Sequence, residues 1–362
     1  NGTRLWGTYF GGVNDEEAWA VACDASNAIY CTGFSASTTN IATVGTYQQV
    51  LDGPSDAYVA KFSPNGVNRL WCTYYGGNQT ENGTDITVFP TGEIILAGNT
   101  TSSTGIASVG AYQLFAGSAD DGFVARLNQT GNRVWGTFFG GNDAEYIDGL
   151  QISTTGNILF AGSTLSTNQI ATPGAWQVNS NNINVYDAYV AMFNLSGNRL
   201  AATYYGGTSN DNCYSMCQDL QGNIYLTGVT TSTDSMGTSG THLSTFAGGQ
   251  DVFLAKMCMM AKPGISPTGP SFICVGDTLV ISSPASSYSY LWSLGSTTNS
   301  MVVEDTTSSG TYYFYVTISD GLGCSVSSDS SIVVIDICSS VAEQECEMEI
   351  FPNPKQNNSD LY

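Results

Sequence analysis

Four carboxylates recur at one position of a repeated pattern, and carboxylates are well suited to acid–base and metal chemistry. They are Glu16, Glu81, Glu145 and Asp211, at intervals of 65, 64 and 66 residues. Two carboxylates at a set separation can hydrolyse a glycosidic bond, and a ring of carboxylates can hold a cation such as Ca²⁺. The alternative is that each one caps a turn or bonds the backbone of a neighbouring element. Fourfold repetition favours this alternative, because a catalytic site usually breaks symmetry.

Other candidate groups also fall within the repeat. Nucleophilic catalysis needs a base beside the nucleophile, and the sequence has one histidine, His242. It stands in the degenerate copy of a repeated loop, so we expect a surface residue rather than a catalytic base. The other copies carry an aromatic residue followed by glutamine, either as a sugar-stacking platform or as an anchor that packs apolar area. These aromatic residues are Tyr47, Tyr112 and Trp176. A second set of carboxylates begins a repeated strand, and we expect structural roles for Asp56, Asp121, Asp187 and Asp251.

Composition excludes several classes of function. The 362 residues include 30 acidic and 9 basic side chains, giving a net charge of −21. Such a chain cannot neutralise phosphates, which argues against binding to nucleic acid or to anionic membrane surfaces. No run of 18 apolar residues is present, so we expect no membrane span. The first residues lead directly into a predicted strand, so we expect any export signal to have been removed or omitted.

Ten cysteines without a CxxC pair, alongside one histidine, make a zinc site improbable. Their number favours disulfides and an oxidising compartment. Cys213 and Cys217 would lie about 13 Å apart on one strand, so we expect no bond between them there. The sequence leaves open the pairing of six cysteines, namely Cys23, Cys31, Cys72, Cys213, Cys217 and Cys258.

Four short sequence phrases recur along the chain with the same spacing, and together they define the repeat. The phrase "LWGTYFGG" at Leu5 returns as "LWCTYYGG", "VWGTFFGG" and "LAATYYGG". "DAYVAKF", "AIYCTG" and "GTYQ" recur with the same period of about 65 residues. Each repeat contains four strand-like runs, which in the first repeat are 18–24, 29–34, 56–62 and 69–75. Four-stranded antiparallel units repeated radially are the blades of a β-propeller, so we predict an all-β protein with a propeller over residues 1–260.

The order of the phrases predicts how the ring closes. The chain starts on a fourth-strand phrase, and the last repeat ends on a third-strand phrase. Pairing Leu5–Phe10 beside Val252–Met257 would complete the last blade and remove both open sheet edges. We therefore predict four blades closed by the amino-terminal strand. The alternative is a larger ring built from two chains.

These phrases resemble a known repeat. "TYFGG", "DASNAIYCTGFSAST", "GTYQ" and "DAYVAKFSPNG" look like the SBBP repeat, a β-propeller repeat whose name refers to seven blades. The resemblance covers about 260 residues and all four repeats. It implies a secreted or cell-surface bacterial protein without a catalytic signature.

A different pattern follows the repeats. Residues 261–270 contain three prolines and read as a linker. Residues 271–337 show short alternating strands with Trp292 between two cysteines, resembling immunoglobulin-like or PKD-like sandwiches. We expect a Cys274–Cys324 bridge, and Cys338 and Cys346 could close a second loop. Residues 338–362 form a tail in which "FPNP" resembles the start of the C-terminal sorting domain of type IX secretion in Bacteroidota.

The resemblance to surface proteins sets the functional expectation. We expect an extracellular, non-enzymatic structural or adhesive protein that binds surface glycans, proteins or copies of itself, as in a filament or matrix. The rival is a secreted carbohydrate-binding or carbohydrate-active protein that uses the propeller mouth. The bacterial resemblance also implies O-glycans on Asp-Ser/Thr-apolar motifs, which Ser235 and Thr278 match.

Overall fold

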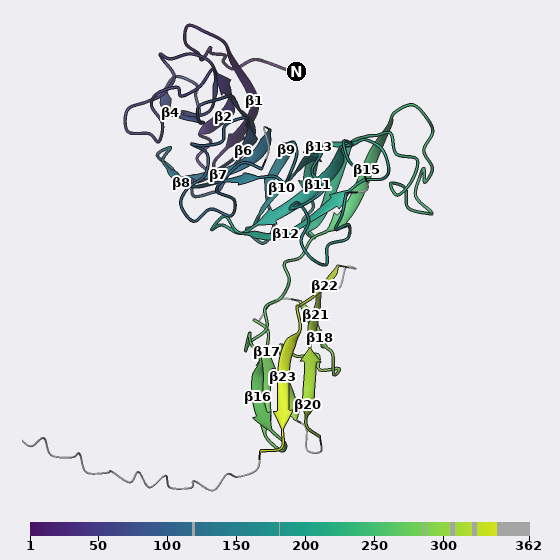
Figure 1. Cartoon of the computed structure of the whole chain (residues 1–362). Helices are drawn as coiled ribbons and strands as arrows, with labels where there is room; N and C mark the ends of the chain where they lie inside the picture. The colour runs from purple at the N-terminus through teal and green to yellow at the C-terminus, as the bar shows by residue number, and fades with distance from the viewer. Residues whose placement is uncertain are drawn as a thin grey trace, which may run out of the picture. The chain divides into compact units, whose positions relative to one another are not determined.

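A computed structural model shows an all-β chain, with no helix among the residues that it describes (Figure 1). These residues are 1–117, 120–180, 182–284, 286, 288–304, 308–320 and 324–338. The chain divides into a first unit, Asn1–Lys262, and a second unit that begins at Pro263.

The first unit consists of four antiparallel sheets, one for each repeat, which we call blades 1 to 4. Blade 1 contains β1 (Glu16–Cys23), β2 (Ile29–Ser35), β3 (Asp56–Phe62) and β4 (Arg69–Tyr75). Blade 2 contains β5 (Glu81–Val88), β6 (Ile94–Thr100), β7 (Asp121–Leu127) and β8 (Arg133–Phe139). Blade 3 contains β9 (Glu145–Ile152), β10 (Ile158–Thr164), β11 (Asp187–Phe193) and β12 (Arg199–Tyr205). Blade 4 contains β13 (Asp211–Gln218), β14 (Asn223–Thr230) and β15 (Asp251–Cys258).

Local sequence explains each blade. In each blade the strands follow one another in sheet order. Tight turns join the first strand to the second and the third to the fourth, as at Gly66, whose φ of 68° suits glycine in the turn before β4, whereas a long loop joins the second strand to the third. The third strands of blades 1 to 3, β3, β7 and β11, carry apolar side chains on both faces and are almost wholly buried. Such a strand needs cover on both sides. The neighbouring blades supply this cover.

The blades stack through contacts that repeat along the array. First strands contact one another in the order β1, β5, β9 and β13. Apolar cores fill the space between blades: Val59 of blade 1 shares a core with Phe123 of blade 2. The Trp71 indole of β4 packs on Gly131 in the next blade and donates from Nε1 to the Gln129 carbonyl at 3.0 Å. Glycine is required at position 131 because a Cβ there would lie 2.8 Å from the indole.

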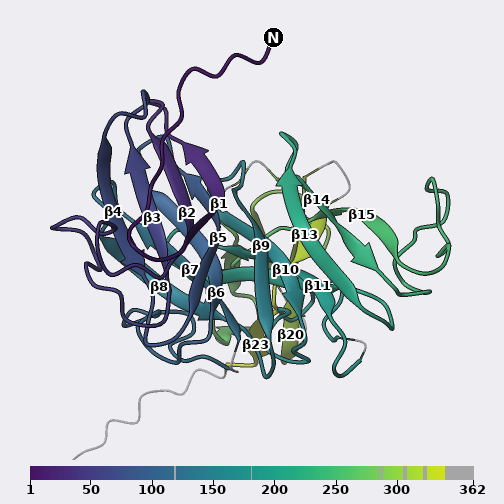
Figure 2. The same ribbon diagram turned by 90° about the horizontal axis from the view of Figure 1, so that it is seen from above.

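The predicted closure of the ring is not present in the structure. No strand precedes Glu16, and β15 pairs with β14 alone among the described residues. The Phe10 ring packs against blade 1 instead, 5.3 Å from the Tyr58 ring. The amino-terminal segment runs over blade 1, while β15 lies at the opposite end of the array (Figure 2). The four blades thus form an open array, because Leu5–Phe10 is fixed to the end that is far from its predicted partner.

The second unit consists of short strands around one core. Its strands are β16 (Ser271–Cys274), β17 (Thr278–Ser282), β18 (Ser289–Trp292), β19 (Ser300–Glu304), β20 (Gly310–Phe314), β21 (Val316–Ser319), β22 (Ser325–Ser327) and β23 (Ser331–Asp336). They form the sheets β16-β23-β20, β17-β19 and β18-β21-β22. Trp292 is 1% exposed and lies in the shared core. The immunoglobulin-like or PKD-like assignment stays a prediction, and the predicted sorting tail lies outside the described residues.

Candidate functional site

The four repeated carboxylates each begin the first strand of a blade. Glu81, Glu145 and Asp211 are fully buried, whereas Glu16 is half-buried at the end of the array. The structure separates the four, placing each in its own blade. In the described part of the chain, no three His, Cys, Asp or Glu side chains gather in a group that could hold a metal.

Each of these carboxylates binds the Gly-Gly phrase that precedes it. The Glu81 Oε2 atom accepts from the Gly77 backbone N–H at 2.8 Å, and Oε1 accepts from the Thr100 hydroxyl at 2.6 Å. Glu145 repeats both contacts, with the Gly141 N–H at 2.9 Å and the Thr164 hydroxyl at 2.6 Å. The carboxylate thus ties the end of one blade to the first two strands of the next.

A second carboxylate faces each of the interior ones. Asp56 begins β3 and is fully buried. Its Oδ2 atom accepts from Gln48 Nε2 at 2.6 Å and from the Asp52 backbone N–H at 3.1 Å. Gln48 Oε1 in turn accepts from the Gly76 N–H at 2.9 Å. The glutamine of the phrase "GTYQ" therefore links the long loop, the third strand and the Gly-Gly phrase.

The two carboxylates meet across the first glycine of each pair. A Cβ at Gly76 would lie 2.4 Å from Glu81 Oε2 and 2.7 Å from Asp56 Oδ1. The same arrangement surrounds Gly140, between Glu145 and Asp121. Only glycine leaves room for both side chains, which explains the first glycine of the phrase. The second glycine has another cause, because a Cβ at Gly77 would lie 2.0 Å from the Thr104 carbonyl oxygen.

Burial of like charges perturbs these groups. Burial raises the pKa of Asp56 to about 7, and the nearby Glu81 charge adds to the rise. Burial also raises the pKa of Glu145 to about 7, helped by Asp121. The Asp56 Oδ1 atom has no hydrogen-bond partner among the described residues.

Glu16, at the end of the array, behaves differently. A Cβ at Gly11 would meet Glu16 alone. Burial still acts to raise its pKa, but hydrogen bonds from Ser37, Gly12 and Ser35 outweigh it, and the pKa is lowered. At the same repeat position, burial in an interior blade junction raises the pKa of Glu145, whereas hydrogen bonds at the end of the array lower the pKa of Glu16.

This geometry suits structure better than hydrolysis. A glycosidase presents both carboxylates to a bound sugar, one of them able to donate a proton. Here the oxygens of the interior pairs are occupied by backbone, amide and hydroxyl donors or turned toward one another in the blade junctions. The glutamines Gln48, Gln113 and Gln177, whose role the sequence analysis missed, each accept at Oε1 from the N–H of the first glycine of the Gly-Gly phrase. Gln48 and Gln113 also donate from Nε2 to the aspartate that begins the third strand. Their recurrence after each loop aromatic was the available signal.

The loop aromatics divide into covered and open positions. Tyr47 lies under the Arg133 guanidinium, with 4.5 Å from Cζ to the ring centroid, and Tyr112 lies under Arg199 at 4.9 Å. Trp176 stacks on Tyr205 at 5.6 Å and is 68% exposed. His242 is an exposed residue of the corresponding loop in blade 4. Trp176 is therefore the one of the three predicted platforms that is open to a ligand.

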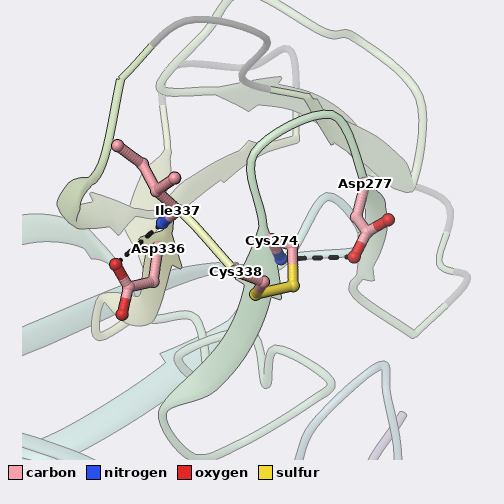
Figure 3. Close-up of a disulfide and its surroundings, with 5 residues drawn as sticks. All are labelled: Cys274, Asp277, Asp336, Ile337 and Cys338. Atoms are coloured by element: carbon pink, nitrogen blue, oxygen red, sulfur yellow. Dashed lines mark hydrogen bonds between the residues drawn. A yellow bond between two sulfur atoms is a disulfide. The ribbon is translucent and has the colours of Figure 1, made fainter. Parts of the chain in front are cut away.

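The disulfide prediction in the second unit is wrong. Cys274 bonds Cys338, with 5.3 Å between their Cα atoms, and not Cys324 (Figure 3). The reason is that β16 pairs in parallel with β23, which places Cys274 opposite Asp336, two residues before Cys338. The suggested Cys338–Cys346 pair is excluded by the same bond, and Cys346 itself lies outside the described residues. Cys324 is disulfide-bonded, as is Cys258 in the first unit.

The remaining cysteines of the first unit are reduced. These are Cys23, Cys31, Cys72, Cys213 and Cys217, so the expectation that Cys213 and Cys217 do not bond is confirmed. Ser235 and Thr278, the two predicted glycosylation positions, are both exposed. No helix of the described residues has the length and apolar character needed to cross a bilayer.

One known family model matches a part of the repeat region. Residues 202–234 match the family model of SBBP, a beta-propeller repeat. The matched segment contains the last Gly-Gly phrase and Asp211, the residues that form the junction described above. The other three repeats carry the same phrases, so the resemblance noted in the sequence is supported where the model matches.

The comparisons with curated proteins and with solved structures give no basis for assigning a function. No curated protein matches the chain. Two crystal structures from B. thetaiotaomicron are similar to it, both of extracellular domains, one of a putative one component system and one of a putative hybrid two component system. They share 11% and 10% identity, cover 92% and 89% of this chain, and each has a TM-score of 0.21. The chain spans 57% of the length of each.

Proposed function

We propose that the protein is an extracellular, non-enzymatic structural or adhesive protein. The first unit would act as a rigid body of stacked blades, and the second unit as a spacer toward a carboxyl-terminal attachment signal. The observation that carries this proposal is the burial of three of the four repeated carboxylates, Glu81, Glu145 and Asp211. They are the best candidates for chemistry in the sequence, and each accepts a hydrogen bond from the Gly-Gly phrase that joins its blade to the preceding one.

The disulfide and the repeat match agree with this proposal. Disulfides persist in oxidising surroundings outside the cytosol, and Cys274–Cys338 closes most of the second unit. A match to a β-propeller repeat supports a scaffold, although fold alone does not determine function.

A binding screen tests the proposal directly. Purified full-length chain would be applied to glycan and matrix-protein arrays and, in parallel, to a polysaccharide hydrolysis screen. We expect saturable binding to a surface or to itself, without turnover. Turnover that disappears in Glu16→Gln or Glu81→Gln would defeat the proposal and favour the carbohydrate-active alternative.

One observation favours a second function, carbohydrate binding. Trp176 presents an exposed indole face that is held in place by stacking on Tyr205, and such faces pack well against the apolar side of a sugar ring. Loss of glycan binding in Trp176→Ala, but not in Val109→Ala at an exposed position of another loop, would establish this role.

A further inference from the structure

The junction between blades 1 and 2 departs from the symmetry of the repeat. Blade 1 carries Asp24 in the turn after its first strand and Lys61 near the end of its third strand. The equivalent pairs in the next two blades are Phe89 with Arg126 and Ser153 with Met192. A ligand site usually breaks the symmetry of a repeat, so the pair of Asp24 and Lys61 marks a candidate.

At the next junction, between blades 2 and 3, the equivalent side chains fill the space. The Phe89 ring packs against the apolar core. The Arg126 guanidinium crosses to blade 3 and donates from Nη1 to the Leu195 carbonyl at 2.9 Å, while Nη2 donates to Glu93 Oε1 at 2.8 Å.

Between blades 1 and 2 a hollow of about 440 Å³ lies in this place. Its wall in blade 1 contains Asp24, Ser26 and Lys61, and its wall in blade 2 contains residues 90–92 and Gln129. The volume lies within the range of about 300–1,000 Å³ that is usual for small-molecule sites. Both walls belong to complete blades, so the hollow does not depend on either end of the array.

The Asp24 carboxylate is charged and already hydrogen-bonded within its own blade. Its Oδ1 atom accepts from the Ser26 N–H at 2.9 Å, the Ser26 hydroxyl at 2.6 Å and the Ala28 N–H at 2.9 Å. Its Oδ2 atom accepts from the Tyr30 hydroxyl at 3.0 Å. Burial acts to raise the pKa of Asp24, but these hydrogen bonds outweigh it and lower the pKa to about 2. Asp24 therefore shapes the wall of the hollow and positions Lys61.

Lys61 has hydrogen-bonding capacity to spare. Its ammonium lies 3.5 Å from Asp24 Oδ2 and 4.8 Å from the centre of the Tyr30 ring, and its side chain is 16% exposed. An ammonium has three N–H donors, and among the described residues Asp24 is the one carboxylate that it meets. A carboxylate that enters the hollow can therefore take a remaining donor in a charge-assisted hydrogen bond.

The wall in blade 2 supplies uncharged polar groups. Thr91 offers a hydroxyl and Gln129 a side-chain amide, and both can donate and accept. The Gln129 backbone carbonyl accepts from the Trp71 indole, which holds this turn against blade 1. The Pro90 ring adds apolar surface. A matching ligand carries one carboxylate for Lys61 beside several hydroxyl groups for the opposite wall.

We propose that this hollow binds a uronic acid, a sugar that carries a carboxylate, with the carboxylate on the Lys61 ammonium and ring hydroxyls on Thr91 and Gln129. Lys61 provides a local positive charge on a chain whose net charge is −21. The site rests on the proposed adhesive function only for the source of the sugar, which is a surface glycan.

Calorimetric titration of the full-length chain with D-galacturonate tests the proposal. We expect saturable binding. D-Galactose lacks the carboxylate and acetate lacks the ring hydroxyls, so each should bind about tenfold or more weakly, as for the loss of hydrogen bonds to charged or polar groups. Galacturonate that does not bind, or that binds no more tightly than galactose or acetate, would overturn the proposal. Either result leaves the adhesive function to be judged by the array screen described above.

Substitution of one lysine locates the site. Lys61→Met is suitable because Met192 occupies the same position in β11. Lys256→Met is the matched control, since Lys256 has this position in β15, in the last blade of the array, and lies 5.8 Å from the Tyr225 ring centre. Lys61→Met should weaken galacturonate binding about tenfold or more, and Lys256→Met should not change it. Equal effects of the two substitutions, or no effect of either, would refute the site.

Chemical protection gives a test on the unaltered chain. The native protein would be acetylated with an N-hydroxysuccinimide ester, with and without galacturonate, and the extent of reaction at each lysine measured by peptide mass spectrometry. Galacturonate should slow acetylation of Lys61 and leave that of Lys256 unchanged. An unchanged rate at Lys61 under saturating galacturonate would show that the sugar binds elsewhere.

Discussion

The carboxylate pair at a blade junction predicts that Asp56→Asn stabilises the protein. The asparagine oxygen can accept the bonds from Gln48 Nε2 and the Asp52 N–H that Asp56 Oδ2 accepts. Its amide nitrogen replaces Oδ1, which has no partner, and faces the Glu81 carboxylate across Gly76. The substitution thus removes a buried charge beside another and supplies a donor.

The magnitude follows from the pKa of Asp56, about 7 in the folded chain and roughly 3.9 when unfolded. Because the folded pKa is raised, the native state keeps its proton between these values while the unfolded state loses it. The stability that this proton maintains is fully present below about pH 4 and lost as the pH rises through 7. Three pKa units correspond to at most about 4 kcal/mol. We therefore expect Asp56→Asn to gain up to about 4 kcal/mol at pH 8, roughly half of that or less at pH 5, and almost nothing at pH 4.

The assay is urea unfolding of the full chain, followed by tryptophan fluorescence at each pH. Asp251→Asn is the matched control, because Asp251 starts β15 at the same repeat position and accepts from the Ala247 N–H at the open edge of the array. We expect no comparable gain there. If Asp56→Asn is less stable than the wild type at pH 8, or its gain does not change between pH 8 and pH 5, the reasoning fails.

Three further predictions concern packing, thiols and the disulfide. Gly76→Ala should cost about 2–3 kcal/mol of unfolding free energy, because the new Cβ meets two carboxylates, whereas Gly7→Ala should change little. In native protein an aromatic disulfide reagent should label the exposed Cys217 quickly. Cys72 is buried and its thiol pKa is raised by burial, so it should react only after unfolding. Equal labelling rates for the two cysteines in native protein would contradict the fold. Cys338→Ser should lower the stability of the second unit by about 4 kcal/mol, as the bond closes a separation of 64 residues; an unchanged thermal midpoint in calorimetry would argue against that pairing.

Local patterns predicted the strands well. The third and fourth strands of the first repeat match β3 and β4 at both ends, because turn residues bound short apolar runs. The first strand begins two residues earlier than predicted, at Glu16. A register shift between Ala18 and Ala20 interrupts the alternation there, which hides the start of the strand from a period-two pattern.

The contacts between repeats could not be predicted in the same way. Fourfold repetition indicated that Glu81 is structural, but not that it faces Asp56, because that contact depends on how the Gly-Gly phrase turns from one blade into the next. The disulfide failed for a related reason. An immunoglobulin-like spacing suggested Cys274–Cys324, whereas the parallel pairing of β16 with β23 brings Cys338 beside Cys274, and no local signal announces a parallel pair.

The amino-terminal phrase shows the same limit. Its sequence identified it correctly as a fourth-strand phrase, since Trp6 and Phe10 make the contacts of Trp71 and Tyr75 at the following junction. The sequence did not say which three strands complete the blade. That choice depends on the rotation between blades, which is set by buried packing at every junction.

The central claim is that the repeated carboxylates hold blades together, and comparing Glu81→Ala with Glu16→Ala tests it most directly. Both lose an acceptor for a glycine N–H and a hydroxyl, but only the interior site is closed to water. Unfolding free energies of the full chain should fall by about 2–4 kcal/mol for Glu81→Ala, which leaves buried donors unpaired, and by about 1 kcal/mol or less for Glu16→Ala. Equal stability in both variants, together with loss of a polysaccharide turnover shown by the wild type, would contradict the account.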